Sequence, residues 1–166
     1  MARAMKDRNL KQEMTVKNNL FSRYLLFRYS LALLFFANLY WIMMLSYRFN
    51  VIIILPLMEL GLLIGAIAEQ FRLYGKMKAV LKMTKLAFLG QIVVNMMAIL
   101  LVILPHQLGT AFPIFSAAPS SKLLLLALQL LGLLTSCLNL KRIEQVKTNT
   151  DKFYYRFQQA FGKILS

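Results

Sequence analysis

Residues 51–68 read VIIILPLMELGLLIGAIA, an apolar run in which Glu59 is the single charged residue. A helix needs about 20 mainly apolar residues to cross the hydrocarbon core of a membrane, which is about 30 Å thick. Three more runs meet this requirement, at 29–47, 86–104 and 123–140. The sequence therefore predicts an all-α integral membrane protein in which four transmembrane helices pack as a bundle.

The overall composition also favours a membrane protein. Hydrophobic residues make up 59% of the 166 residues, whereas soluble domains contain about 45–50%. The formal net charge is nevertheless +14, a combination that arises when apolar spans alternate with basic connections. Because the basic residues flank the spans and form no domain of their own, we do not expect the protein to bind nucleic acid.

Basic residues are distributed unevenly among the segments that flank the spans. Arg48 and Lys122 are the only ones in the first and third connections, and all others lie in residues 1–28, 69–85 and 141–166. Lysine and arginine are enriched on the cytoplasmic side of membrane proteins. We therefore expect both termini and the middle connection to be cytoplasmic. The Lys- and Leu-rich, cysteine-poor composition favours the bacterial cytoplasmic (inner) membrane as the location.

The chain divides into a basic N-terminal segment (1–28), a membrane domain (29–140) and a basic C-terminal segment (141–166). In the last segment, apolar residues share one helical face: Ile143, Val146, Phe153, Phe157, Ala160, Phe161 and Ile164. Our candidates for binding anionic lipid headgroups accompany this face: Lys141, Arg142, Lys152, Arg156 and Lys163. We predict an amphipathic helix on the cytoplasmic membrane surface, with docking on a partner protein as the alternative.

The connections on the other side of the membrane differ in length. Residues 47–50 are so few that the first two spans must form a tight antiparallel hairpin. Residues 105–121 contain several prolines and small residues, so we expect an irregular segment along the outer headgroups, with Phe112 as an interfacial aromatic residue. Tyr40 and Trp41 lie deeper, and we expect them either to pack against another helix or to indicate a displaced first span.

Every span carries a strongly polar residue near its centre. Asn38, Glu59 and Asn95 are central in the first three spans, and Gln129 is near the centre of the fourth. Gln91 precedes Asn95 by four positions and therefore shares its helical face. Interhelical hydrogen bonds contribute about 0.6–2 kcal/mol each. We predict that these five side chains form an intramembrane polar cluster where the helices meet.

Glu59 occupies the least favourable position in this set. An acidic residue at the centre of a span costs about 2.5–3.5 kcal/mol on insertion scales, so it should face protein or a water-filled cavity. Burial away from water disfavours the charged carboxylate, and the spans contain no cation at this depth. We therefore expect an uncharged Glu59 that donates a hydrogen bond to one amide side chain and accepts one from another.

Small residues indicate further packing faces. Gly61, Gly65 and Ala68 share a face of the second span, and the GxxxG spacing of the two glycines permits close backbone approach. At 100° per residue this face lies about 140° or more from Glu59. Gly132 and Ser136 extend the polar side of the fourth span. The second span thus has two faces suited to protein contact, which predicts a central helix or an interface helix.

Sequence motifs for catalysis are absent. Cys137 is the only cysteine, so no CxxC motif or intrachain disulfide exists. Nucleotide-binding loops and HExxH motifs are also absent, and Glu69, His106 and Asp151 are scattered outside the spans. We therefore expect neither an enzyme nor a metal or other cofactor.

Three functional readings remain open. The first is a small accessory or scaffold subunit that associates through its helices with a membrane complex, as a partner of another protein or as a homo-oligomer. The alternative is an oligomeric proton- or ion-coupled small transporter that uses Glu59. In the third, the polar residues only lock the bundle.

Overall fold

The computed structural model describes residues 2–73, 80–116, 118–148 and 150, and the secondary structure of these residues is helical. In chain order the helices are α1 (Ala2–Ser46), the short 3₁₀ helix η1 (Val51–Ile53), α2 (Ile54–Arg72), α3 (Lys82–Ile103), α4 (Leu108–Ala111) and α5 (Pro119–Lys147).

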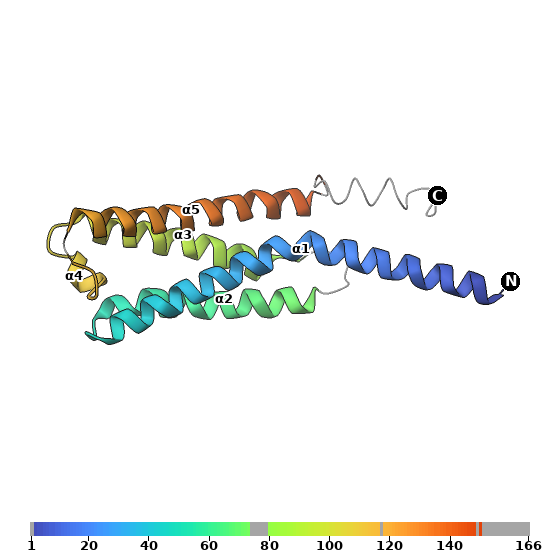
Figure 1. Cartoon of the computed structure of the whole chain (residues 1–166), viewed down its shortest axis with the longest axis horizontal. Helices are drawn as coiled ribbons and strands as arrows, with labels where there is room; N and C mark the ends of the chain where they lie inside the picture. Colours follow the sequence, from blue (N-terminus) through green and yellow to red (C-terminus); the bar gives the residue numbers. More distant parts are fainter. Residues whose placement is uncertain (1, 74–79, 117, 149, 151–166) are drawn as a thin grey trace.

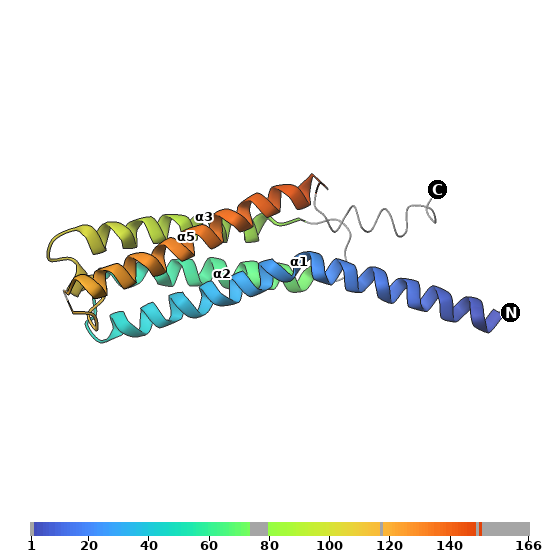
Figure 2. The same cartoon turned by 45° about the horizontal axis from the view of Figure 1, so that its top comes forward.

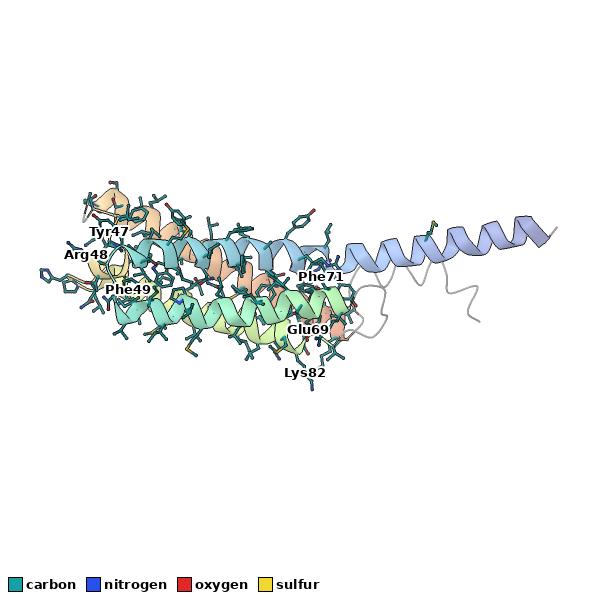
Figure 3. All side chains as sticks on the ribbon, turned by 90° about the horizontal axis from the view of Figure 1, so that it is seen from below. Tyr47, Arg48, Phe49, Glu69, Phe71 and Lys82 are labelled. Atoms are coloured by element: carbon teal, nitrogen blue, oxygen red, sulfur yellow. The ribbon has the colours of Figure 1, made fainter. Side chains whose placement is uncertain are left out.

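The helices α1, α2, α3 and α5 pack side by side, and the chain reverses direction between successive long helices (Figures 1 and 2). α2 packs extensively on both α1 and α3, and α3 on α5, whereas α1 and α5 contact each other less. Figure 3 shows Tyr47, Arg48 and Phe49 at one end of the bundle and Glu69, Phe71 and Lys82 at the other.

Four stretches in the described part of the chain are long and apolar enough to cross a membrane: Tyr24–Ser46, Val51–Arg72, Lys82–Ile103 and Pro119–Lys147. The prediction of an all-α bundle with four candidate spans is therefore confirmed. These spans suggest an integral membrane protein. The expected amphipathic face beyond Val146 lies in residues 151–166, outside the described residues.

The first helix is much longer than a membrane span. α1 contains 45 residues and is about 67 Å long at a rise of 1.5 Å per residue. It continues without a break across residue 28, where the predicted N-terminal segment ends. Figures 1 and 2 show that its first half extends beyond the ends of α2, α3 and α5. We call this projecting part, residues 2–23, the α1 arm.

Two apolar clusters form the core of the bundle. The first contains Phe27 and Leu31 of α1 and Phe88 of α3, and the second contains Trp41 of α1 and Val102 of α3. On α1 the buried Asn38 lies in sequence between the two clusters, and on α3 the buried Gln91 does so. A polar layer thus separates two apolar ones near the middle of the candidate spans.

The connection between α3 and α5 folds back onto the bundle. It contains α4, and Leu108, Ala111 and Phe112 are buried. The Trp41 indole N–H donates to the Ala111 carbonyl (3.0 Å), and the Trp41 and Phe112 rings stack at a centroid distance of 5.4 Å and an angle of 8°. The prediction of an interfacial Phe112 is wrong because Trp41 provides a stacking partner that removes the ring from the surface.

Glu69, near the end of α2, caps the beginning of α3. Its carboxylate accepts hydrogen bonds from the backbone N–H of Met83 (3.0 Å) and of Thr84 (2.7 Å), and from the Thr84 hydroxyl (2.7 Å). The first backbone N–H groups of a helix lack partners within the helix, and Leu81 at the N-cap position provides no side-chain cap. Gln70 adds a hydrogen bond to the Thr84 hydroxyl (2.8 Å), so the two helices are joined at this end.

Candidate functional site

Side-chain amides form a hydrogen-bonded chain from α1 to α3 within the polar layer. The Asn38 amide donates to the Gln91 side-chain carbonyl (2.7 Å) and to the backbone carbonyl of Leu34 (2.9 Å). The Gln91 amide in turn donates to the Asn95 side-chain carbonyl (2.9 Å). Their spacing of four places Gln91 and Asn95 on one face of α3, and all three amide side chains are at most 4% exposed.

The amide chain reaches α5 by contact with Gly132. A Cβ atom at this position would lie 2.6 Å from the Asn95 side-chain nitrogen and 3.3 Å from its Cγ atom. Only glycine leaves room for Asn95 here without a shift, so the absence of a side chain at Gly132 allows α5 to pack directly over the amide chain. The Asn95 nitrogen Nδ2 itself is buried without a hydrogen-bond partner.

Glu59 is also buried, at 2% exposed, but it lies apart from the amides. Its carboxyl group lies against Gly90 of α3, close to where a side chain at that position would begin. The expected hydrogen bonds to Asn38, Gln91 and Asn95 are not formed, and Oε1 of Glu59 has no partner. Because successive residues of a helix are rotated by about 100°, Gly90 faces α2 while Gln91 is directed to α1.

Gln129 borders the amide chain without joining it. Its side chain on α5 is half-buried, and among the described residues no hydrogen bond connects it to Asn38, Gln91 or Asn95. All four amide residues line a cavity of about 170 Å³. The structure thus groups four of the five predicted polar residues around one space and leaves Glu59 outside it.

The other walls of this cavity are apolar and aromatic. Trp41 and Phe112 form one end, and Phe115 packs edge-on against Phe112 at a centroid distance of 6.5 Å. Ala37 on α1 and Leu128 on α5 are exposed lining residues. Since the α3 amides are buried and the exposed lining lies on α1 and α5, the cavity opens sideways between these two helices.

The predicted small-residue faces have different surroundings. A Cβ atom at Gly65 would lie 2.8 Å from the Met83 side chain of α3, whereas a Cβ atom at Gly61 would meet nothing within 4 Å. Gly61 and Ala68 are exposed on the outer face of α2. Ser136 is fully buried, and its hydroxyl donates to the Gly132 carbonyl (2.9 Å).

Several contributing residues were not predicted as site residues. Asn139 of α5 donates to the Ser30 hydroxyl of α1 (2.8 Å) and so joins these helices near one end of the bundle. Gly90 is essential for the position of Glu59. A single glycine within an apolar helix is a sequence signal for close packing, but the predicted span centres put Asn95, five residues further along, at the depth of Glu59.

The predicted headgroup-binding residues are only partly described. Lys141 is exposed and Arg142 is half-buried near the end of α5, and Lys152, Arg156 and Lys163 lie outside the described residues. A cleft of about 300 Å³ at the same end is lined by Lys82, Lys85 and Lys147 together with Glu144 and apolar residues. Its predominantly positive lining is compatible with anionic headgroups.

Comparison of the chain with known protein families, curated proteins and solved structures finds no match. Within the part of the chain that the structure describes, no three His, Cys, Asp or Glu side chains gather in a way that would hold a metal ion. The candidate site is therefore defined by its own geometry, as an amide-lined cavity with an aromatic end wall.

Proposed function

We propose that this protein is an accessory or scaffold subunit that associates with another membrane protein. The observation that carries this proposal is the α1 arm, a helix that extends beyond the other described helices (Figures 1 and 2). Isolated helices are marginal in water, because most helical stability in proteins comes from tertiary packing. A projecting helix of this length is therefore suited to packing on a partner, and Met14 within it is exposed.

The outer face of α2 offers a second contact within the membrane. Leu57, Gly61, Ile64 and Ala68 are exposed along it, and the open space at Gly61 permits close approach of another helix. The central polar side chains Asn38, Glu59, Gln91 and Asn95 are instead buried within the bundle. A partner helix would thus meet α2 through apolar and small residues, without Glu59.

Photo-crosslinking in living cells tests this association. A photoreactive residue at Met14 or Ile64 is expected to form a discrete adduct with a second protein, while one at the exposed Leu131 of α5 is not. Removal of residues 2–23 should abolish the Ile64 adduct if the arm and the α2 face bind the same partner. Adducts only with lipid, or of twice the mass of the chain itself, would show that no other protein is held there.

We further propose that the distribution of basic residues sets the orientation of the bundle in the membrane. The α1 arm and the end of α5 near Lys147 would then lie in the cytoplasm. In a Cys137→Ser background, a membrane-impermeant thiol reagent should label Tyr47→Cys in intact cells. Lys147→Cys should react only after the membrane has been opened. Both residues are exposed, and the opposite labelling pattern would invert the proposed orientation.

One observation favours proton- or ion-coupled transport as a second candidate function. Oε1 of Glu59 is buried without a hydrogen-bond partner, and buried carboxyl groups in membranes commonly mark ion pathways. The test is flux in proteoliposomes: Glu59→Gln should abolish transport driven by a pH gradient while the bundle remains folded. Flux that is absent from the wild-type vesicles, or that persists in Glu59→Gln, removes this candidate.

A further inference from the structure

The exposed lining residues of the amide-lined cavity lie on α1 and α5, two of the candidate membrane-spanning helices. The cavity floor consists of the buried Gln91 and Asn95 of α3, and Ala37, Tyr40 and Leu128 on α1 and α5 are exposed. The Asn139–Ser30 hydrogen bond joins α1 to α5 elsewhere along the bundle (2.8 Å). A molecule that enters between these helices at the cavity would therefore come from the lipid phase.

Two side-chain amide nitrogens at this cavity donate no hydrogen bond to the protein. Nδ2 of Asn95 is buried and unpaired, and no hydrogen bond within the described residues involves the side chain of Gln129. Unsatisfied polar groups in a hydrocarbon environment cost several kcal/mol each, because no bulk water is present to replace the missing bonds. These amides therefore favour a bound molecule that supplies a hydrogen-bond acceptor.

The cavity lining also defines the charge of a suitable ligand. It contains no Asp, Glu, His, Lys or Arg residue. Burial of an unpaired charge is strongly unfavourable, so the occupant must be neutral. Trp41 is fixed by its hydrogen bond to the Ala111 carbonyl (3.0 Å), and together with Phe112 it provides a rigid aromatic surface at one end.

The cavity volume limits the size of the part of a ligand that can be buried. An apolar protein cavity of about 150 Å³ accommodates one benzene molecule, and the cavity beside Gln129 measures about 170 Å³. One six-membered ring with a carbonyl substituent fits this space, and an attached hydrocarbon chain would remain between α1 and α5.

We propose that this cavity binds the ring of a neutral, lipid-soluble carbonyl compound of the quinone class. The ring enters from the membrane between α1 and α5 and lies near Trp41 and Phe112, and a carbonyl oxygen accepts a hydrogen bond from the Gln129 amide. This site is independent of the proposed association with a partner, because the α1 arm and the outer face of α2 do not contribute to it.

Trp41 is the only tryptophan in the chain, so its fluorescence reports directly on the cavity wall. The experiment titrates a benzoquinone with a decyl side chain into the full-length protein in lipid nanodiscs. Quinones quench indole fluorescence on close approach, and binding at the cavity is expected to give saturable quenching. Bromodecylbenzene, a quencher of similar shape without a carbonyl group, should bind more weakly.

Two substitutions and two matched controls locate the binding site. Gln129→Leu removes the hydrogen-bond donor and should weaken binding about threefold to tenfold, as expected for one hydrogen bond. Ala37→Phe fills the cavity from its rim and should abolish saturable quenching. Gln145→Leu and Ala127→Phe make the same changes at exposed positions of α5 outside the cavity lining and should leave binding unchanged.

Circular dichroism establishes whether each variant is folded. If Ala37→Phe does not fold, the binding measured for Gln129→Leu decides the outcome. Linear quenching without saturation in the wild-type protein would overturn the proposal. Saturable quenching that neither cavity substitution alters would also overturn it, because the ligand would then bind elsewhere. Equal affinity for bromodecylbenzene, together with an unaffected Gln129→Leu variant, would exclude recognition of the carbonyl group.

Discussion

The carboxyl group of Glu59 on α2 lies directly against Gly90 on α3, in the space that a side chain at position 90 would need. The contact brings a buried acid of one helix to the backbone of the next. It explains why Glu59 packs between α2 and α3 without a hydrogen bond to the neighbouring amide chain.

Gly90→Ala is expected to destabilise the bundle by about 1–3 kcal/mol, the usual cost of overpacking a core. The added Cβ atom would meet the Glu59 carboxyl and would lie 3.0 Å from the Leu62 side chain. Gly61→Ala is the matched control, since a Cβ atom there has no neighbour within 4 Å. Reversible unfolding in mixed detergent micelles measures both changes, and equal losses would contradict the role given to Gly90.

Removal of the Glu59 carboxyl should reduce the effect of a side chain at position 90. In Glu59→Ala, the further substitution Gly90→Ala is expected to cost less than it does in the wild-type protein, because the obstructing carboxyl group is gone. Residues in contact show coupling free energies of about 0.5–3 kcal/mol in such cycles. If the effects of the two substitutions on the free energy of unfolding are additive, Glu59 and Gly90 are not energetically coupled.

Gly132 on α5 leaves the space that the Asn95 side chain of α3 occupies. Gly132→Ala would place a Cβ atom 2.6 Å from the Asn95 side-chain nitrogen, and we expect a loss of about 1–3 kcal/mol in the free energy of unfolding. Gly109→Ala, with open space around the new atom, serves as the control. The loss should shrink in an Asn95→Ala background. If it stays the same, Asn95 does not set the spacing between α3 and α5.

The hydrogen bond from Asn38 to Gln91 should couple α1 to α3. Asn38→Leu and Gln91→Leu are each expected to destabilise the protein, and the double variant should lose less than the sum. The coupling expected for one interhelical hydrogen bond in a membrane is about 0.6–2 kcal/mol. The unfolding measurement used for Gly90 determines it, and a coupling of zero would mean that the 2.7 Å contact contributes nothing to stability.

Loss of the Glu69 cap should loosen the beginning of α3. Glu69→Ala removes the acceptor for the Met83 and Thr84 backbone N–H groups, and capping residues contribute about 0.5–2 kcal/mol. Hydrogen exchange should accelerate at these two amides, with little change in the middle of α3. Glu144→Ala is the control, because its side chain is exposed near the end of α5. Unchanged exchange in Glu69→Ala would refute the cap.

The sequence was sufficient to predict the helical class and the candidate spans, because the cost of placing a segment in hydrocarbon depends mainly on its own composition. The same principle indicated a buried position for five polar residues, of which Asn38, Glu59, Gln91 and Asn95 are buried and Gln129 is half-buried. A polar side chain at the centre of a span must avoid lipid whatever its neighbours are. The composition of residues 105–121 does not by itself decide whether they are buried. The buried stack of Phe112 on Trp41 depends on a contact between residues 71 positions apart in the sequence.

The partners of the buried groups depend on helix rotation, which local composition does not define. Gly90 and Gln91 are adjacent in sequence, yet the first meets Glu59 of α2 and the second meets Asn38 of α1. A rotation of α3 by about 100° would exchange these faces without changing the hydropathy of any span. The sequence alone therefore indicated that the polar side chains at the middle of the first three spans are buried. Only the packing of the helices decided that the amides bond to one another around a cavity while Glu59 lies against a glycine.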